Sequence, residues 1–221
     1  MLIPLSYPLT QDSPLYPGNP EVTITKNRSM EFGDSANSSV VTFGTHSGTH
    51  IDAPRHFCPT GKTLAECLQT QGVYEKTICI SIPAGSDTCI TADCIRKQLQ
   101  NITDIDALIL RTGYCHIRDK EPLKYRDNHP WVHPDVPEFL RNTYPHLRLF
   151  GIDILSVSRP DHRKMGHDCH RAFLCGDQGI LLLEDADLRT LPETVTPFHL
   201  HVYPWILGAE DGSPVMVLAD I

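Results

Sequence analysis

The segment THSGTHIDAPRHF, residues 45–57, places His46, His50, Asp52 and His56 at even-numbered positions. Alternate side chains of an extended chain point to the same side, so these four would share one face of a strand. Burying four such side chains without a cation would be costly. Imidazole nitrogen and carboxylate oxygen are the usual ligands of Zn²⁺ and also suit Mn²⁺ and Fe²⁺. The pattern therefore predicts a metal site on this segment.

A flat strand cannot bring the two outer ligands together. At about 3.3 Å per residue, His46 and His50 would lie roughly 13 Å apart in a fully extended chain. The chain must bend between them, and Gly48 supplies the glycine that a turn favours. Pro54 favours a second bend ahead of His56. We therefore expect a ligand group before Pro54, and His56 beyond it in a position to transfer a proton.

One segment offers too few ligands, so others must come from elsewhere in the chain. The segment GHDCHRAFL (166–174) offers His167 and His170, three positions apart. Glu184 ends the apolar run LLLE, which places a carboxylate either at a cleft or in the first turn of a helix. From the residues alone, both histidines and both interpretations of Glu184 remain open.

The surrounding sequence predicts an α/β or α+β fold with a mixed sheet. Helices are expected at 90–101, with Thr91 as the N-cap, and at 133–145. The predicted strands have alternating or continuous apolar patterns and cover 22–26, 37–48, 77–83, 106–113, 147–154, 179–186, 199–207 and 214–221. Strands and helices interleave without a linker or repeat, so one domain over residues 1–221 is expected.

Composition limits the class of partner. The formal net charge of −8, with no basic run, argues against nucleic acid and fits a small-molecule substrate. No stretch is apolar enough for a membrane span, and the N-terminal residues do not resemble a signal peptide. The eight cysteines form no CxxC pair and are expected to be free thiols in a reducing cytoplasm. Only Cys58 and Cys169, which lie near histidines, merit consideration as catalytic.

The segment HSGTHIDAPRHF (46–57) resembles the HxGTHxDxPxHF signature of the metal-dependent cyclase family, which includes bacterial kynurenine formamidases and isatin hydrolases. Similar segments follow along most of the chain: LYPGNP (15–20), LILRTGY (108–114), LFGIDILSV (149–157), HRAFL to LLLEDADL (170–188) and GAEDGSPVMVLA (208–219). Asn19, Ser158 and Met216 depart from the family's usual residues. The resemblance implies a swivelling β/β/α fold in a homodimer or homotetramer.

The resemblance also implies a role for each matching residue. The implied metal ligands are His46, His50, Asp52, His170 and Glu184. Asp52 would bridge two ions, Glu184 would be shared between them, and His170 is selected over His167. Some relatives with Gln in place of this Glu hold one metal, so Glu184 favours two divalent ions, Zn²⁺ or Mn²⁺. His56 would be the residue that transfers protons.

The implied activity is hydrolysis of a small amide, with an aryl formamide such as N-formylkynurenine of tryptophan catabolism as the leading substrate. Metal-activated water would attack the carbonyl, with His56 as the general base. Tyr16 and Trp131 could stack on a flat substrate or simply pack the subunit. One alternative is a lactam or isatin-type hydrolase, or another cyclase acting on a different small carbonyl compound. The other is a non-catalytic metal-binding protein, which would have no need of His56.

Overall fold

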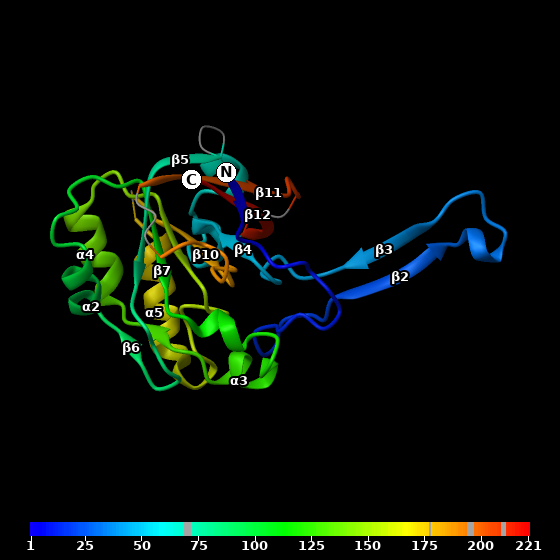
Figure 1. The fold of residues 1–221 in the computed structure, drawn as a ribbon, viewed down its shortest axis with the longest axis horizontal. Coiled ribbons are helices and arrows are strands. Elements are labelled where there is room, and N and C mark those ends of the chain that lie inside the picture. The colour runs from blue at the N-terminus through cyan, green and yellow to red at the C-terminus, as the bar shows by residue number, and fades with distance from the viewer. Residues whose placement is uncertain (69–71, 177, 194–196, 209–210) are drawn as a thin grey trace.

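A mixed eight-stranded sheet forms the body of the computed structural model (Figure 1), which describes all residues except 69–71, 177, 194–196 and 209–210. Its strands are β1 (Leu2–Pro4), β4 (His50–Asp52), β5 (Val73–Ser81), β7 (Ala107–Arg111), β9 (Leu149–Ile152), β10 (Leu181–Glu184), β11 (Phe198–Pro204) and β12 (Gly212–Asp220). The strand order is β1-β12-β11-β5-β7-β9-β10-β4, and β12 also pairs with β4. This last pairing closes the sheet into a barrel-like form.

Four central strands are parallel and carry the apolar core. β5, β7, β9 and β10 pair side by side in the same direction, and every residue of β7, β9 and β10 is buried. Continuous apolar runs such as ALILR in β7 suit strands that are buried on both faces. β4 then pairs antiparallel with β10 and sets Glu184 opposite His50. This register joins the histidine-rich segment to the core.

The helices gather largely on one side of the sheet, where α2, α4 and α5 pack together (Figure 1). The helices are α1 (Leu64–Leu68), α2 (Ala92–Gln98), α3 (Pro122–Asp127), α4 (Asp135–Thr143) and α5 (Arg163–Leu174), with 3₁₀ turns η1 (Met30–Phe32), η2 (Pro54–His56), η3 (Tyr114–Ile117) and η4 (Pro160–His162). Phe173 of α5 stacks on Phe150 of β9 at 4.9 Å. The predicted mixed α/β class is confirmed. Within the described residues, no helix has the length and apolarity needed to cross a membrane.

The predicted elements are mostly present, with some differences. Both predicted helices form, and Thr91 is the N-cap of α2, although its side chain makes no capping hydrogen bond. The strand expected at 37–48 ends early, because the chain turns after Thr42 toward the site. Helix α5 was not predicted, since its sequence is rich in charged and polar residues. Ala209 and Glu210 of the GAEDGSP motif lie outside the described residues.

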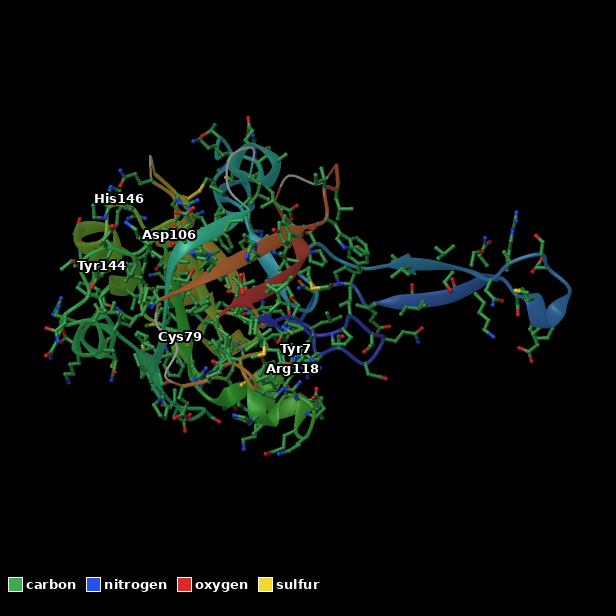
Figure 2. All side chains as sticks on the ribbon, turned by 45° about the horizontal axis from the view of Figure 1, so that its top comes forward. Tyr7, Cys79, Asp106, Arg118, Tyr144 and His146 are labelled. Atoms are coloured by element: carbon green, nitrogen blue, oxygen red, sulfur yellow. A yellow bond between two sulfur atoms is a disulfide. The ribbon has the colours of Figure 1, made fainter. Side chains whose placement is uncertain are left out.

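Strands β2 (Thr23–Arg28) and β3 (Ser38–Thr42) form a hairpin that projects from the body (Figure 1). Every residue in both strands is exposed, and Figure 2 shows their side chains standing out along the arm. The exposed apolar residues of the hairpin are Ile24, Met30, Phe32, Val40 and Val41. An isolated two-stranded hairpin is marginally stable at best in water. This arm has an apolar surface that the described part of the chain leaves uncovered.

The expectation of eight free thiols is wrong for one pair. Cys58 and Cys175 form a disulfide with a Cα–Cα distance of 5.9 Å, which lies in the range that a bridge requires. The sequence could not show this pairing, because 117 positions separate the two residues and only the fold brings η2 beside the end of α5. Cys169 is buried in α5, and burial raises the pKa of its thiol well above the usual value. It is thus poorly suited to act as a nucleophile.

Candidate active site

The histidine-rich segment bends at the two places that the sequence predicted. Gly48 has φ = +65°, in the left-handed region that glycine favours, and lies in the turn before β4. Only His50–Asp52 is extended, and Pro54 then begins the 3₁₀ turn η2 that ends at His56. The two bends therefore place His46 and His56 on either side of a short strand rather than along one flat face.

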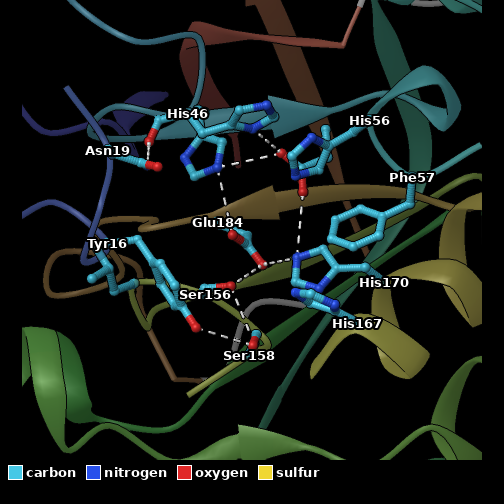
Figure 3. Close-up of a pocket in the computed structure, with 13 residues that line it drawn as sticks. Tyr16, Asn19, His46, His56, Phe57, Ser156, Ser158, His167, His170 and Glu184 are labelled. Carbon is cyan, nitrogen blue, oxygen red and sulfur yellow. Dashed lines mark hydrogen bonds and ion pairs between the residues drawn. The ribbon is translucent and has the colours of Figure 1, made fainter. Parts of the chain in front are cut away.

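A cavity of about 190 Å³ lies over this strand (Figure 3). Its walls come from β4, η2, α5, β10 and the segment that follows β9. The lining residues are Tyr16, Asn19, His46, His50, Asp52, His56, Phe57, Leu155, Ser156, Ser158, His167, His170 and Glu184. The fold thus brings all five predicted metal ligands, the predicted proton-transfer residue and Tyr16 to a single cavity.

Two buried histidines turn the same ring nitrogen toward the carboxylates. His50 Nδ1 donates to the carbonyl oxygen of Gly48, and His170 Nδ1 donates to that of Gly166, each at 2.8 Å. Their Nε2 atoms therefore carry the free lone pairs. His50 Nε2 lies 3.3 Å from Asp52 Oδ1 and 3.5 Å from Glu184 Oε2. Both rings are pre-oriented as ligands toward one group of acidic oxygens.

The carboxylates fit a divalent cation. Asp52 and Glu184 are both almost fully buried, and Asp52 Oδ2 has no hydrogen-bond partner among the described residues. His170 Nε2 lies 3.7 Å from this oxygen and 3.5 Å from Glu184 Oε1. A buried carboxylate oxygen without a partner is costly unless a cation compensates it. The arrangement of nitrogen and carboxylate donors is the one that Zn²⁺ and Mn²⁺ prefer.

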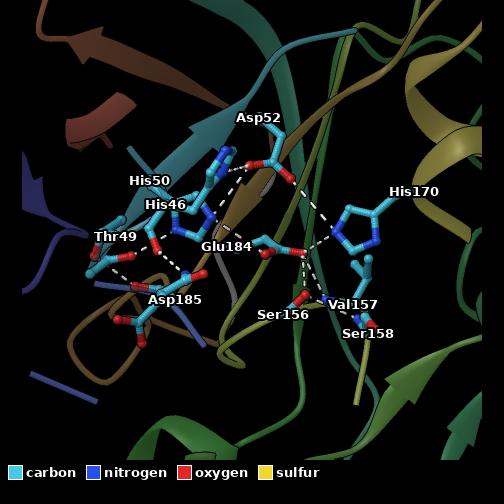
Figure 4. A network of polar contacts seen from close by, with 12 residues as sticks. His46, Thr49, His50, Asp52, Ser156, Val157, Ser158, His170, Glu184 and Asp185 are labelled. Carbon is cyan, nitrogen blue, oxygen red and sulfur yellow. Dashed lines mark hydrogen bonds and ion pairs between the residues drawn. The ribbon is translucent and has the colours of Figure 1, made fainter. Parts of the chain in front are cut away.

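The segment after β9 fixes the second carboxylate. Glu184 Oε1 accepts hydrogen bonds from the Val157 amide at 2.7 Å and from Ser156 Oγ at 3.1 Å (Figure 4). Burial and the Asp52 carboxylate oppose the charge on Glu184, but the nearby imidazoles of His170 and His50 lower its pKa to about 2. The carboxyl group is therefore ionised at neutral pH and held in one orientation.

His46 faces a carboxylate at each ring nitrogen. Nδ1 lies 2.7 Å from Asp52 Oδ1, and Nε2 lies 3.0 Å from Asp211 Oδ2. Burial disfavours a charged ring, yet Asp52 and Asp211 together raise the pKa of His46 to about 9. Sequence reasoning missed Asp211, which is 165 positions away. The only sequence signal was its place in the GAEDGSP motif.

The pKa of His56 shifts in the opposite direction to that of His46. Its ring stacks on that of His46 with centroids 3.8 Å apart. Burial, with the neighbouring imidazoles of His46 and His170, lowers the pKa of His56 to about 4. The ring is therefore neutral at pH 7 and has a nitrogen free to accept a proton. The neighbouring Phe57 stacks on His170 at 4.6 Å and shields this side of the cavity.

Of the two predicted substrate contacts, one lies at the cavity and the other does not. Tyr16 lines the cavity, and its hydroxyl lies 3.3 Å from Ser158 Oγ. Trp131 does not line the cavity: its ring stacks on His162 at 4.3 Å, and the Arg159 guanidinium lies over it at 4.4 Å. Only Tyr16 is therefore retained as a candidate substrate contact.

The three departures from the family pattern and the second candidate histidine also lie in different places. Asn19 and Ser158, which depart from the family's usual residues, line the cavity, whereas Met216 is not among the lining residues and is 53% exposed on β12. His167, the histidine left open from the sequence, lies on an exposed part of the cavity wall, with its ring 5.5 Å from that of Phe57.

The barrel-like mixed sheet and the nitrogen and carboxylate donors of this cavity fit a metal-dependent hydrolase. A family model described as putative cyclase matches residues 3–159, so the chain belongs to that family. It is 30% identical over 215 residues to a kynurenine formamidase of Bacillus cereus, covering 96% of this chain and 94% of the relative. It is also 30% identical over 220 residues to that of Bacillus cytotoxicus, covering 98% and 95%.

Solved structures share the fold. An isatin hydrolase bound to the product analogue thioisatinate has a TM-score of 0.80 at 20% identity, covering 99% of this chain and 91% of that one. A potential metal-dependent hydrolase with cyclase activity has a TM-score of 0.73 at 22% identity, covering 99% and 96%. Together with the formamidase relatives, these similarities support an enzyme of metal-dependent formamide or amide hydrolysis.

Proposed function

We propose that this chain hydrolyses the C–N bond of a small aryl formamide, as in N-formylkynurenine, with two divalent ions at the cavity. The observation that carries the proposal is the convergence of the imidazoles of His50 and His170 on the carboxylates of Asp52 and Glu184, with a neutral His56 beside them. The similarity to kynurenine formamidases over nearly the whole chain supports the choice of substrate.

The proposed ligands are the five that converge on the cavity: His46, His50, Asp52, His170 and Glu184. Asp52 supports a bridging role, because its two oxygens face different histidines: Oδ1 faces His46 and His50, and Oδ2 faces His170. Divalent ions held there would supply Lewis acidity, which polarises a carbonyl and makes water easier to deprotonate. Zn²⁺ is the leading candidate and Mn²⁺ the second, since both accept this donor set.

His56 moves the proton in this proposal. Its neutral imidazole accepts a proton from the attacking water at the free ring nitrogen and returns it to the leaving nitrogen as the C–N bond breaks. One formamide and one water thereby give formate and the free aryl amine. Tyr16 lies across the cavity, where its ring offers a surface for the aryl group.

The proposal treats residues 1–221 as one hydrolase domain that assembles as a homodimer or homotetramer. The pairing of β1 with β12, from opposite ends of the chain, supports a single domain. The exposed apolar residues of the β2–β3 hairpin support association with a second copy, and light scattering after size exclusion would test it.

A cytoplasmic location stays a prediction. Alkylating free thiols during cell lysis and then measuring whether Cys58 and Cys175 are bridged would test it, because a reducing compartment opposes the disulfide.

The test is an activity panel on the purified chain loaded with Zn²⁺ or Mn²⁺. N-formylkynurenine and formanilide should be hydrolysed, and His56→Ala should lower kcat by about 10²–10⁴-fold while the metal content stays that of the wild type. His162→Ala, which replaces a histidine outside the cavity, is the matched control and should leave kcat unchanged. Near-full turnover by a metal-loaded His56→Ala variant would refute the proposed mechanism.

The same panel separates the alternatives. Isatin and simple lactams are included because the chain shares its fold with isatin hydrolases. Preferential ring opening of those compounds would replace the formamidase assignment with a lactam hydrolase or related cyclase. A chain that binds metal but hydrolyses no amide, lactam or ester would support the non-catalytic alternative. The neutral, half-buried His56 beside the ligand group argues against this last outcome, because metal storage does not require it.

A further inference from the structure

Asp211, directly before β12, is fixed to the histidine-rich segment at three points. Its Oδ2 accepts hydrogen bonds from His46 Nε2 at 3.0 Å and from Thr45 Oγ1 at 2.9 Å. Its main-chain oxygen accepts a hydrogen bond from the amide of Ala53 at 2.8 Å. The side chain is 37% exposed, so these contacts rather than burial hold it in place. The carboxylate therefore has one defined position beside His46.

The His46 ring is constrained on its other sides as well. Nδ1 faces Asp52 Oδ1 at 2.7 Å, and the ring of His56 stacks on it at 3.8 Å. A Cβ atom at Gly212 would lie 2.8 Å from His46 Cε1, so the imidazole packs against backbone that only glycine leaves open. A flip of the ring would replace both nitrogen contacts with carbon. The two carboxylates thus fix which nitrogen faces which side.

We propose that Asp211 is a positioning residue of the metal site. Its carboxylate accepts a hydrogen bond from Nε2–H of His46, which keeps the proton on Nε2 and directs the lone pair of Nδ1 toward Asp52 and the ion. The inference rests on the proposed metal site. Metal-ligating histidines usually donate their second ring N–H to such a partner, and losing it typically weakens metal binding by about 10–100-fold.

His46 differs from the other two proposed histidine ligands in the kind of partner it has. His50 and His170 donate Nδ1–H to main-chain carbonyls, which no substitution removes directly. His46 depends on a side chain, so its orientation can be tested by changing Asp211 alone. Asp220, at the far end of β12, is a matched control because its side chain is similarly exposed, at 45%, and it contacts the N-terminus instead of the site.

The experiment measures the affinity of the chelator-stripped full chain for Zn²⁺ and for Mn²⁺ by competition with a chromogenic chelator. Asp211→Ala should weaken binding by about 10–100-fold. Asp211→Asn should weaken it less, since the amide oxygen still accepts a hydrogen bond from Nε2, and Asp220→Asn should match the wild type. If Asp211→Ala fails to fold, Asp211→Asn decides the outcome.

A second readout separates positioning from a general loss of structure. In ¹⁵N spectra of the Zn²⁺-loaded wild type, His46 should appear as the Nε2–H tautomer. This signal should change most in Asp211→Ala, which lacks the acceptor, and less in Asp211→Asn. Wild-type affinity, within about twofold, together with an unchanged His46 tautomer in a folded Asp211 variant would overturn the inference. A wild type that binds neither ion would overturn it together with the proposed function. A wild type that binds metal but hydrolyses no formamide would contradict the function alone.

Discussion

The replacement Gly166→Ala sets two opposing effects against each other in helix α5. In an exposed helix interior, alanine in place of glycine favours folding by about 1 kcal/mol. At this position, however, a Cβ atom would lie 1.8 Å from Ser158 Oγ, 2.3 Å from its Cβ and 2.9 Å from its Cα. Rotating the Ser158 side chain relieves only the first contact. The helix or the segment after β9 must therefore move.

The steric clash should outweigh the gain in helix propensity. Overpacking of this kind costs about 1–3 kcal/mol, and a clash that reaches the backbone belongs at the upper end. Subtracting the helix-propensity gain leaves a net loss of roughly 2 kcal/mol. For a chain of this length, that loss lowers Tm by roughly 4–8 °C. Metal affinity should fall too, because the displaced carbonyl of Gly166 accepts the hydrogen bond that orients His170.

Thermal unfolding followed by circular dichroism checks this prediction. Gly85→Ala is the control, since a Cβ there meets nothing within 4 Å, and its Tm should not fall. Adding Ser158→Gly to Gly166→Ala removes two of the three close contacts and should restore part of the lost stability. A Gly166→Ala variant at least as stable as the wild type would refute the reasoning, because helix propensity alone predicts that result.

Three further predictions concern stability. Burial lowers the pKa of His129 from 6.5 to about 4, so below pH 6.5 the unfolded chain binds a proton that the folded chain does not. His129 should therefore contribute a loss of roughly 3 kcal/mol of stability between pH 7 and 4, measured in urea titrations as the difference between the wild type and His129→Asn. Cys175→Ser should cost roughly 2–4 kcal/mol, and a reducing agent should lower the Tm of the wild type alone. Zn²⁺ at about 100 times its Kd should raise Tm by roughly 5–10 °C, and excess chelator should reverse the rise.

The short-range part of the site was predictable from the sequence, because few backbone conformations can bring His46, His50 and Asp52 together. Strand spacing required the bend at Gly48, and the structure has it. The parts that could not be predicted depend on distant segments. Glu184 meets His50 through the antiparallel pairing of β10 with β4. A local pattern carries no information on such pairing, and the resemblance to a family supplied it instead.

The same reasoning explains the missed cysteine pair and the omission of Asp211. Cys58 and Cys175 were taken as free thiols because no short spacing joins them, yet the meeting of η2 with the end of α5 brings their Cα atoms to 5.9 Å. The local sequence around Asp211 predicts only a turn residue before a strand. It becomes part of the site only because Gly212 pairs opposite Asp52. Both depend on which distant segments meet in the fold, and a local sequence pattern does not show that.

The cavity has two walls with different chemical roles. One wall holds the buried histidines and carboxylates, whose spacing is set by the pairing of β4 with β10 and by α5. The other holds Tyr16, Asn19 and Ser158, and the last two depart from the family's usual residues. Hydrogen bonds link this second wall to the ligands: Asn19 Nδ2 donates to the main-chain oxygen of His46. The Ser158 amide donates to Ser156 Oγ, which in turn donates to Glu184 Oε1. A substitution at Asn19 or Ser158 therefore acts on the supports of His46 and Glu184 as well as on the lining of the cavity.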